Sequence, residues 1–175
     1  EPEVFENPNQ TNRVIYTHKQ SSGGVIVKGM EGLLVRFAGC CNPVPGDEIV
    51  GFVTRGRGVS IHRTDCVNMI NISEMDRARL LDAEWQVSSE DSTGKMYSAG
   101  INIYVTDKMG VLVEVARVLQ ENEINVTAMS SRVAKNNTAT ISVSFDVRSV
   151  AQLNKVIDKL RNLECVYDIE RTTGG

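Results

Sequence analysis

The apolar periodicity of residues 95–173 is the feature that most constrains how this chain can fold. Ile101, Ile103 and Val105 alternate with polar neighbours, the period-two pattern of a half-buried strand. Similar segments follow at 126–133, 141–147 and 165–171. Between the strands lie two stretches with helical spacing: Leu112, Val115, Ala116 and Leu119, then Val150, Leu153, Ile157 and Leu160. The order β-α-β-β-α-β predicts a ferredoxin-like domain whose two helices cover one face of the sheet.

Polar residues beside these helical stretches predict where the helices begin and end. We expect Asp107 to cap the first helix because its carboxylate can accept hydrogen bonds from the free first-turn N–H groups. Ser149 should cap the second helix in the same way, and Asn122 should end the first.

Residues 23–87 predict a different kind of unit, rich in glycine and short apolar runs. Turn signals separate these runs, which predict short strands at 25–27, 33–37, 49–53, 59–61 and 80–87. Thr64 and Asp65 predict a helix start, with Cys66, Met69 and Ile70 on its buried face. We therefore expect an α/β (α+β) chain in which a small β-rich α+β domain precedes the ferredoxin-like one.

Two polar segments frame these domains. Residues 1–22 predict a linker whose end, 12–16, could become a strand, and 88–94 (SSEDSTG) predicts a second linker. We thus expect domains at 23–87 and 95–173. Because the chain begins at Glu1, we also expect it to be a fragment of a longer protein.

Composition excludes several classes of protein. No apolar run approaches the roughly 20 residues that cross a bilayer, and no signal peptide is evident. The four cysteines of a 175-residue chain with a regular core need not form disulfides, which favours a reduced, cytoplasmic protein. The formal net charge is −3, so any nucleic-acid contact must come from locally concentrated positive charge.

One thiol-rich constellation stands out: Cys40, Cys41, His62 and Cys66. Three thiolates and an imidazole would suit tetrahedral zinc. Neighbouring side chains on an extended backbone point apart, however, so one of the adjacent cysteines could fail to reach the metal. The alternative is a metal-free thiol–imidazole cluster that fixes two loops. A Cys nucleophile activated by His62, with Asp65 nearby, is a weaker catalytic alternative because the unit looks too small for a substrate cleft.

Positive charge gathers around this constellation. Between Ile49 and Arg63 there is no acidic residue, and Gly56 and Gly58 place Arg55 and Arg57 on an open hairpin tip. Arginine suits phosphate because its planar fork donates two hydrogen bonds. Only Phe52 could stack on a base, so folded RNA fits better than a single strand. The candidate RNA-binding set is Arg36, Arg55, Arg57, His62 and Arg63; a solvated loop is the alternative.

The turn after the first strand of the ferredoxin-like domain is a second candidate site. A helix N-terminus suits the carboxylate of a small ligand, and Gly110 permits close approach to the backbone. The D-x-x-G-x-L motif at 107–112, within this strand–helix order, resembles an ACT domain. That resemblance implies an amino-acid site, commonly across a dimer interface, formed by Asp107, Met109, Gly110, Val111, Leu112 and Asn125. A capped helix without a ligand is the alternative.

The string AGCCNPVPGDEIVGFVTRGRGVSIHRTDC, followed by an ACT-like domain, resembles the C-terminal regulatory region of long Rel/SpoT-type enzymes. These enzymes make and degrade (p)ppGpp in the bacterial stringent response. The resemblance implies that the first unit is a zinc-finger or ribosome-intersubunit (RIS) domain. It also places the family's Cys-Cys…His…Cys pattern on Cys40, Cys41, His62 and Cys66.

The same resemblance implies a function and a set of partners. The chain would be a non-catalytic regulatory fragment that binds ribosomal RNA on starved ribosomes, close to uncharged tRNA. It would relay regulation to upstream catalytic domains of a GTP/GDP pyrophosphokinase and (p)ppGpp hydrolase, with a homodimer through the ACT domain as a further expectation. The alternative is a sensor of branched-chain amino acids.

Overall fold

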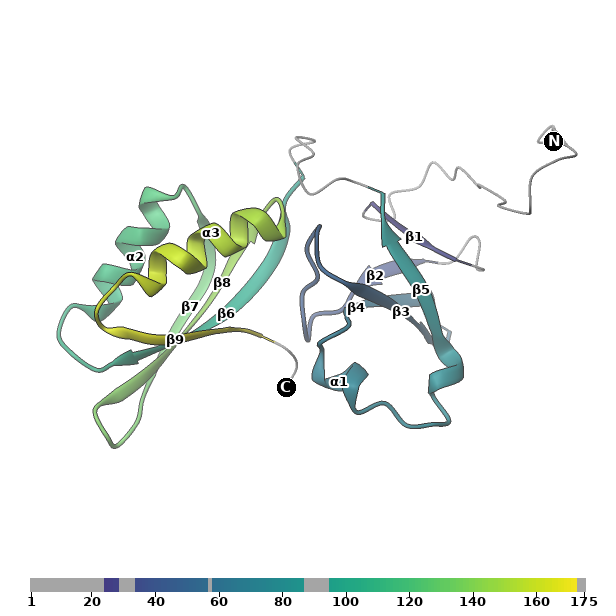
Figure 1. Ribbon diagram of the computed structural model, residues 1–175, viewed down its shortest axis with the longest axis horizontal. Coiled ribbons are helices and arrows are strands. Elements are labelled where there is room, and N and C mark those ends of the chain that lie inside the picture. Colours follow the sequence, from purple (N-terminus) through teal and green to yellow (C-terminus); the bar gives the residue numbers. More distant parts are fainter. Residues whose placement is uncertain (1–23, 29–33, 57, 87–94, 173–175) are drawn as a thin grey trace, which may run out of the picture.

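The computed structural model describes residues 24–28, 34–56, 58–86 and 95–172. Within them the chain forms two sheets, each in its own unit (Figure 1). The predicted linkers at 1–22 and 88–94, and the predicted strand at 12–16, lie outside the described residues.

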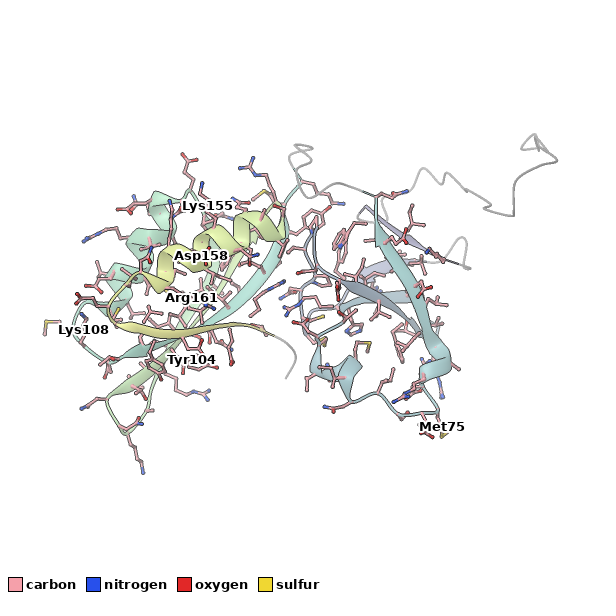
Figure 2. The ribbon with its side chains drawn as sticks, viewed as in Figure 1. Met75, Tyr104, Lys108, Lys155, Asp158 and Arg161 are labelled. Carbon is pink, nitrogen blue, oxygen red and sulfur yellow. The ribbon has the colours of Figure 1, made fainter. Side chains whose placement is uncertain are left out.

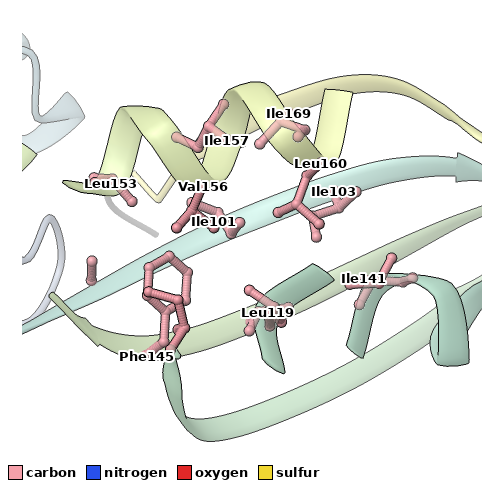
Figure 3. Close-up of a cluster of buried hydrophobic side chains, with 14 of the residues drawn as sticks. Ile101, Ile103, Leu119, Ile141, Phe145, Leu153, Val156, Ile157, Leu160 and Ile169 are labelled. Atoms are coloured by element: carbon pink, nitrogen blue, oxygen red, sulfur yellow. The ribbon is translucent and has the colours of Figure 1, made fainter. Parts of the chain in front are cut away.

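The second unit has the predicted ferredoxin-like fold. Its strands are β6 (Tyr97–Thr106), β7 (Asn125–Val133), β8 (Thr138–Val147) and β9 (Val166–Arg171), and its helices are α2 (Val111–Glu121) and α3 (Val150–Arg161). The sheet order is β7-β8-β6-β9, with all neighbours antiparallel. Both helices cover one face, and a continuous apolar core fills the space between α3 and the sheet (Figures 1 and 3).

The observed N-terminal cap matches the one predicted from the sequence at α3 but not at α2. The Ser149 hydroxyl accepts a hydrogen bond from the Gln152 N–H at 3.4 Å, which confirms the predicted cap. The predicted cap at Asp107 is wrong, because α2 begins at Val111 and has no side-chain cap. Asp107 instead donates its backbone N–H to Asn137 O at 2.7 Å, which ties it to the β7–β8 turn.

The buried side of α2 also differs from the prediction. It is formed by Val111, Val115 and Leu119, whereas Leu112 and Ala116 are exposed. On α3, the predicted stripe is confirmed at Leu153, Ile157 and Leu160, and the outer side carries the polar residues Lys155 and Asp158 (Figure 2).

The first unit contains β1 (Val25–Val27), β2 (Val35–Phe37), β3 (Ile49–Thr54), β4 (Gly58–Arg63) and β5 (Leu80–Trp85), in the order β1-β5-β3-β4-β2. A short helix, α1 (Val67–Ile70), and a 3-10 turn, η1 (Arg77–Arg79), link β4 to β5. The helix predicted to start at Thr64–Asp65 is present but begins at Val67 with Cys66 as its N-cap residue, because the Asp65 carboxylate binds Arg63 instead. Met69 is only half-buried and Ile70 is exposed, so α1 buries only its N-cap residue, Cys66.

The two units are packed against each other. Val44, from the loop after the cysteine pair, is fully buried in the core of the second unit. Phe37 and Trp85 of the first unit stack with ring centroids 5.6 Å apart, and both rings lie nearly perpendicular to that of Tyr97 from β6, with centroids 5.8 Å apart. Among the described residues, no helix has the length and apolar character needed to cross a membrane.

Candidate metal centre and nucleic-acid interface

The four residues of the thiol-rich constellation converge at one point in the first unit. Their ligand atoms all lie within 4.8 Å of one another: Cys40 Sγ, Cys41 Sγ, His62 Nδ1 and Cys66 Sγ. Cys40 Sγ is 3.9 Å from the Sγ of Cys41 and 3.6 Å from that of Cys66. His62 Nδ1 lies 3.4 Å from Cys40 Sγ and 3.8 Å from Cys41 Sγ. Such a Cys/His cluster is able to hold a metal ion.

The backbone explains how two adjacent cysteines reach one point. Residues 39–41 form a turn rather than an extended segment, closed by a hydrogen bond from the Asn42 N–H to Ala38 O at 3.0 Å. Asn42 itself has a positive φ of 45°. The expected difficulty, that neighbouring side chains point apart, applies to extended backbone and is absent here. His62 is on β4 and Cys66 caps α1, so the cluster joins a turn, a strand and a helix.

Burial makes the cluster unfavourable for charged thiolates when no cation is present. Burial, with further contributions from the neighbouring Cys40 and Cys66, raises the pKa of Cys41 to about 12. Burial also raises the pKa of Cys66 and lowers the pKa of His62, which keeps the imidazole neutral. A divalent cation would compensate the thiolate charges, and a neutral imidazole is the form that binds metal.

These same features disfavour a catalytic cysteine. A nucleophilic cysteine needs a lowered pKa, whereas burial raises the pKa of both Cys41 and Cys66. Asp65, the acid considered for orienting His62, binds the Arg63 guanidinium through both carboxylate oxygens, at 2.9 and 2.6 Å. That guanidinium lowers the pKa of Asp65.

The structure separates the predicted RNA-binding residues into two groups. Arg36 on β2 and Arg55 at the β3–β4 hairpin tip are exposed, whereas Arg57 lies outside the described residues. His62 and Arg63 are buried. Contrary to the prediction, Arg63 does not offer its guanidinium to RNA, because this group binds Asp65, Cys41 O and Thr172 O and its side chain is buried.

A further arginine lies beside the hairpin tip. Arg79 of η1 donates to Val53 O at 2.9 Å, and its guanidinium lies 4.5 Å from the centre of the Phe52 ring. The hydrogen bond from Ser73 lowers the pKa of Asp76 most, followed by that from Arg79, with a smaller electrostatic contribution from Arg55. Sequence reasoning missed Arg79 because η1 is distant from the hairpin in sequence, and only the β3–β5 pairing brings it there.

The ACT-like candidate residues lie on the turn between β6 and α2. Asp107, Met109, Gly110 and Leu112 are exposed, and Val111 is buried. Gly110 has a φ of 86°, and a Cβ placed there would meet nothing within 4 Å. Asn125 opens β7 and donates to the Asp146 carboxylate at 2.9 Å. Two hollows, of about 450 and 310 Å³, have none of these residues in their lining.

An apolar surface lies next to this turn, on the edge strand β7. Val126, Met129 and Val133 pair with Phe145, Val143 and Ala139, whose side chains are buried beneath the helices. The β7 side chains therefore face the helical side of the sheet, yet they are 37%, 37% and 61% exposed. Leu112 and Val113 of α2 are also exposed.

Comparison with known proteins assigns each of the two units to a domain family. Residues 25–86 match the RelA/SpoT RIS domain, and residues 93–171 match the ACT domain. A GTP pyrophosphokinase of Streptomyces coelicolor is 37% identical over 150 residues, covering 86% of this chain and 17% of the relative. The Escherichia coli K12 GTP pyrophosphokinase is 35% identical over 160 residues, covering 89% of this chain and 20% of the relative.

The chain thus spans about a fifth of the length of these curated relatives. Among solved structures, the crystal structure of the ACT domain from the Chlorobium tepidum GTP pyrophosphokinase is 27% identical, with a TM-score of 0.40. It covers 44% of this chain and 99% of that domain.

Proposed function

Because the chain belongs to the RelA/SpoT family, with a RIS domain followed by an ACT domain, we propose that it is a non-catalytic regulatory region of a stringent-response GTP pyrophosphokinase. In this proposal the RIS domain (23–87) binds ribosomal RNA on starved ribosomes, near uncharged tRNA. The ACT domain (95–173) relays the bound state to upstream catalytic domains in the cytoplasm.

We propose zinc as the metal of the RIS cluster. Bond lengths of about 2.3 Å to sulfur and 2.0–2.1 Å to nitrogen, at tetrahedral angles, separate two sulfurs by about 3.8 Å and sulfur from nitrogen by about 3.6 Å. Two sulfur pairs are 3.6 and 3.9 Å apart and two sulfur–nitrogen pairs are 3.4 and 3.8 Å apart, which supports this fit; the pairs of Cys66 Sγ with Cys41 Sγ and with His62 Nδ1 lie within 4.8 Å. Zinc would have a structural role here, because four protein ligands leave no open position for substrate.

The observation that carries RNA binding is the exposed Arg55 on a hairpin whose base is fixed by this cluster. β3 and β4 pair from Ile49↔Arg63 to Thr54↔Gly58, so the strand that carries His62 also holds the tip. Arg55 can then reach phosphate while Arg79 lies beside it. The acidic Asp76, which pairs with Arg79 at 3.2 Å, offsets part of the local positive charge, so we expect Arg55 to be one of several contributors to RNA affinity.

Ribosome co-sedimentation across a salt series tests this function. Arg55→Ala should weaken binding and reduce the slope of log affinity against log salt by about one for a lost phosphate contact. Arg117→Ala, an exposed arginine on α2 of the ACT domain, is the matched control and should leave the slope unchanged. Equal affinity and slope for Arg55→Ala and the wild type would contradict docking through this hairpin.

A second function, amino-acid sensing by the ACT domain, is favoured by the missing side-chain cap of α2. Its N-cap is Gly110 and no side chain caps it; the Val111 N–H bonds to Lys108 O at 3.3 Å, and the following first-turn N–H groups would be the donors to a ligand carboxylate. Titration with valine, isoleucine or leucine should then shift NMR signals of Asp107–Leu112 and Asn125. No shift at millimolar ligand would reject this function.

A homodimer through the ACT domain would cover the apolar surface of β7 and α2. Edge strands expose unpaired backbone groups and readily pair with a second copy. Met129→Glu should therefore lower the dimer fraction in sedimentation-velocity experiments. A wild-type chain that remains monomeric at high concentration would contradict this proposal.

A further inference from the structure

The segment that follows the cysteine pair is inserted into the ACT domain. Val44 is fully buried in the ACT core. Pro45 O accepts a hydrogen bond from the Val150 N–H at 2.8 Å. Val150 is the first residue of α3, and a first-turn N–H has no partner within its own helix. A carbonyl of the RIS domain therefore completes the cap of an ACT helix.

A buried ion pair holds the other end of this segment. Asp47 and Arg171 form two hydrogen bonds, at 2.6 and 2.9 Å, with side-chain exposures of 8% and 15%. The Asp47 carboxylate also accepts the Val44 N–H at 2.8 Å, so it fixes the loop as well as β9. Removing one partner of such a pair leaves an uncompensated buried charge. Figure 1 shows the end of β9 running toward the first unit.

Arg63 connects the cluster directly to the same junction. Its side chain is 4% exposed, and one guanidinium nitrogen donates both to Cys41 O at 3.2 Å and to Thr172 O at 3.1 Å. Its backbone N–H donates to Cys41 Sγ at 3.3 Å. A single residue thus contacts a cluster cysteine and the chain just beyond β9 of the ACT domain.

We propose that metal binding at Cys40, Cys41, His62 and Cys66 fixes the RIS domain rigidly on the ACT domain, with Arg63 as the positioning residue that transmits the constraint. This inference rests on the proposed metal site. Metal fixes the turn at 39–41, and hence the position of Cys41 O. Arg63 and the 42–47 loop then hold β9 and the first turn of α3. Without metal, the 39–41 turn loses this constraint and the junction opens more often.

Amide hydrogen exchange of the 175-residue chain tests the coupling. Reduced, chelator-treated protein is compared with protein loaded with Cd²⁺, whose thiolate bonds give an ultraviolet absorption band that reports occupancy. Loading should slow exchange of the Val150 amide by about tenfold or more, since this amide is protected by Pro45 O only while the junction is closed. The Ile141 amide, inside the ACT sheet, is the internal control and should change by less than about twofold.

Arg63→Lys separates metal binding from coupling. It keeps all four ligands and the charge, but lysine cannot reproduce the planar fork. The variant should retain the Cd²⁺–thiolate band and lose the slowing at Val150. Arg79→Lys, outside the junction, is the matched control and should behave like the wild type. Asp65→Asn removes the negative charge of the exposed partner of Arg63 and gives a second, milder test if Arg63→Lys does not fold.

The outcomes separate the two proposals. Slowing at Val150 that depends on Arg63 supports the coupling. If Cd²⁺ loading gives the thiolate band but does not change the exchange rate of the Val150 amide, the coupling is overturned while the proposed metal site is supported. Absence of the band overturns both the metal site and the coupling. Because no ribosome is present in these experiments, their results do not bear on the proposal that Arg55 binds RNA.

Discussion

The two domains are stabilised in different ways. The ACT core contains a large set of buried apolar residues from both helices and from β6, β8 and β9, centred on Phe145, Ile101 and Leu160 (Figure 3). The buried core of the RIS domain is limited, among described residues, to Val25, Val59 and Ile61. Small domains with little core depend on metals, disulfides or partners. The ACT domain should therefore fold on its own core, whereas the RIS domain depends on the cluster and on the ACT domain.

Phe145→Ala should produce the largest effect and should affect both domains. Its ring is fully buried, so its loss should lower the free energy of unfolding of the ACT domain by about 3–5 kcal/mol. Trp85, the single tryptophan, reports on unfolding of the RIS domain. This transition should also move to lower urea concentration, because Val44 loses its binding site in the ACT core. Urea unfolding followed by helical circular dichroism and by Trp85 fluorescence measures both.

Val113→Ala is the control for this substitution, because Val113 is on α2 and 62% exposed. It should leave both transitions nearly unchanged. A Phe145→Ala protein whose Trp85 transition stays at the wild-type urea concentration would show that the RIS domain does not depend on the ACT core.

Gly58→Ala should weaken the RIS domain alone. Gly58 has a φ of 86°, and an added Cβ would lie 2.1 Å from Leu34 O. The strain of the left-handed conformation and the clash with backbone should together cost about 2 kcal/mol or more. Fluorescence of Trp85 should show this loss while the helical signal is preserved.

Gly39→Ala is the matched glycine substitution, because nothing lies within 4 Å of a Cβ at that position. We expect it to be nearly neutral. An equal loss in the helical transition of Gly58→Ala would mean that damage spreads from the RIS domain to the ACT domain, contrary to the asymmetry proposed here.

Ser149→Ala should have the smallest effect and act on the ACT domain. It removes the side-chain cap of α3 and should cost about 1 kcal/mol, measured from the helical transition. Ser149→Asp keeps an acceptor at the cap and should restore stability. If Ser149→Ala costs nothing, the bond from Val150 to Pro45 O is sufficient to cap the helix.

Sequence alone predicted much of the ACT domain because its signals are local. Period-two and helical spacing located the strands and helices, and Ser149 capped α3 as expected. Prediction failed where contacts with residues distant in sequence determine how a side chain or backbone group is bonded. Asp107 is held by Asn137 O rather than capping α2, and the Arg63 guanidinium is held inside the protein by Cys41 O and Thr172 O. No local pattern announces either contact.

The cluster illustrates the same limit. The residue types at Cys40, Cys41, His62 and Cys66 indicated a metal site, but an extended backbone was assumed for the adjacent cysteines. The turn closed by Asn42 and Ala38 brings both sulfurs to one point. The junction with the ACT domain was equally invisible in the sequence, because it pairs Asp47 with Arg171 across most of the chain.

Zinc removal monitored by the two spectroscopic signals tests the central claim most directly. Helical circular dichroism comes mainly from α2 and α3 of the ACT domain, while Trp85 lies on β5 of the RIS domain, beside Tyr97 at the junction, so its transition reports unfolding of the RIS domain together with its release from the ACT domain. On chelation, the Trp85 transition should move to clearly lower urea while the helical transition stays within error. Unchanged Trp85 unfolding, or an equal shift of both transitions, would contradict the claim that the cluster stabilises the RIS domain and the ACT core stands alone.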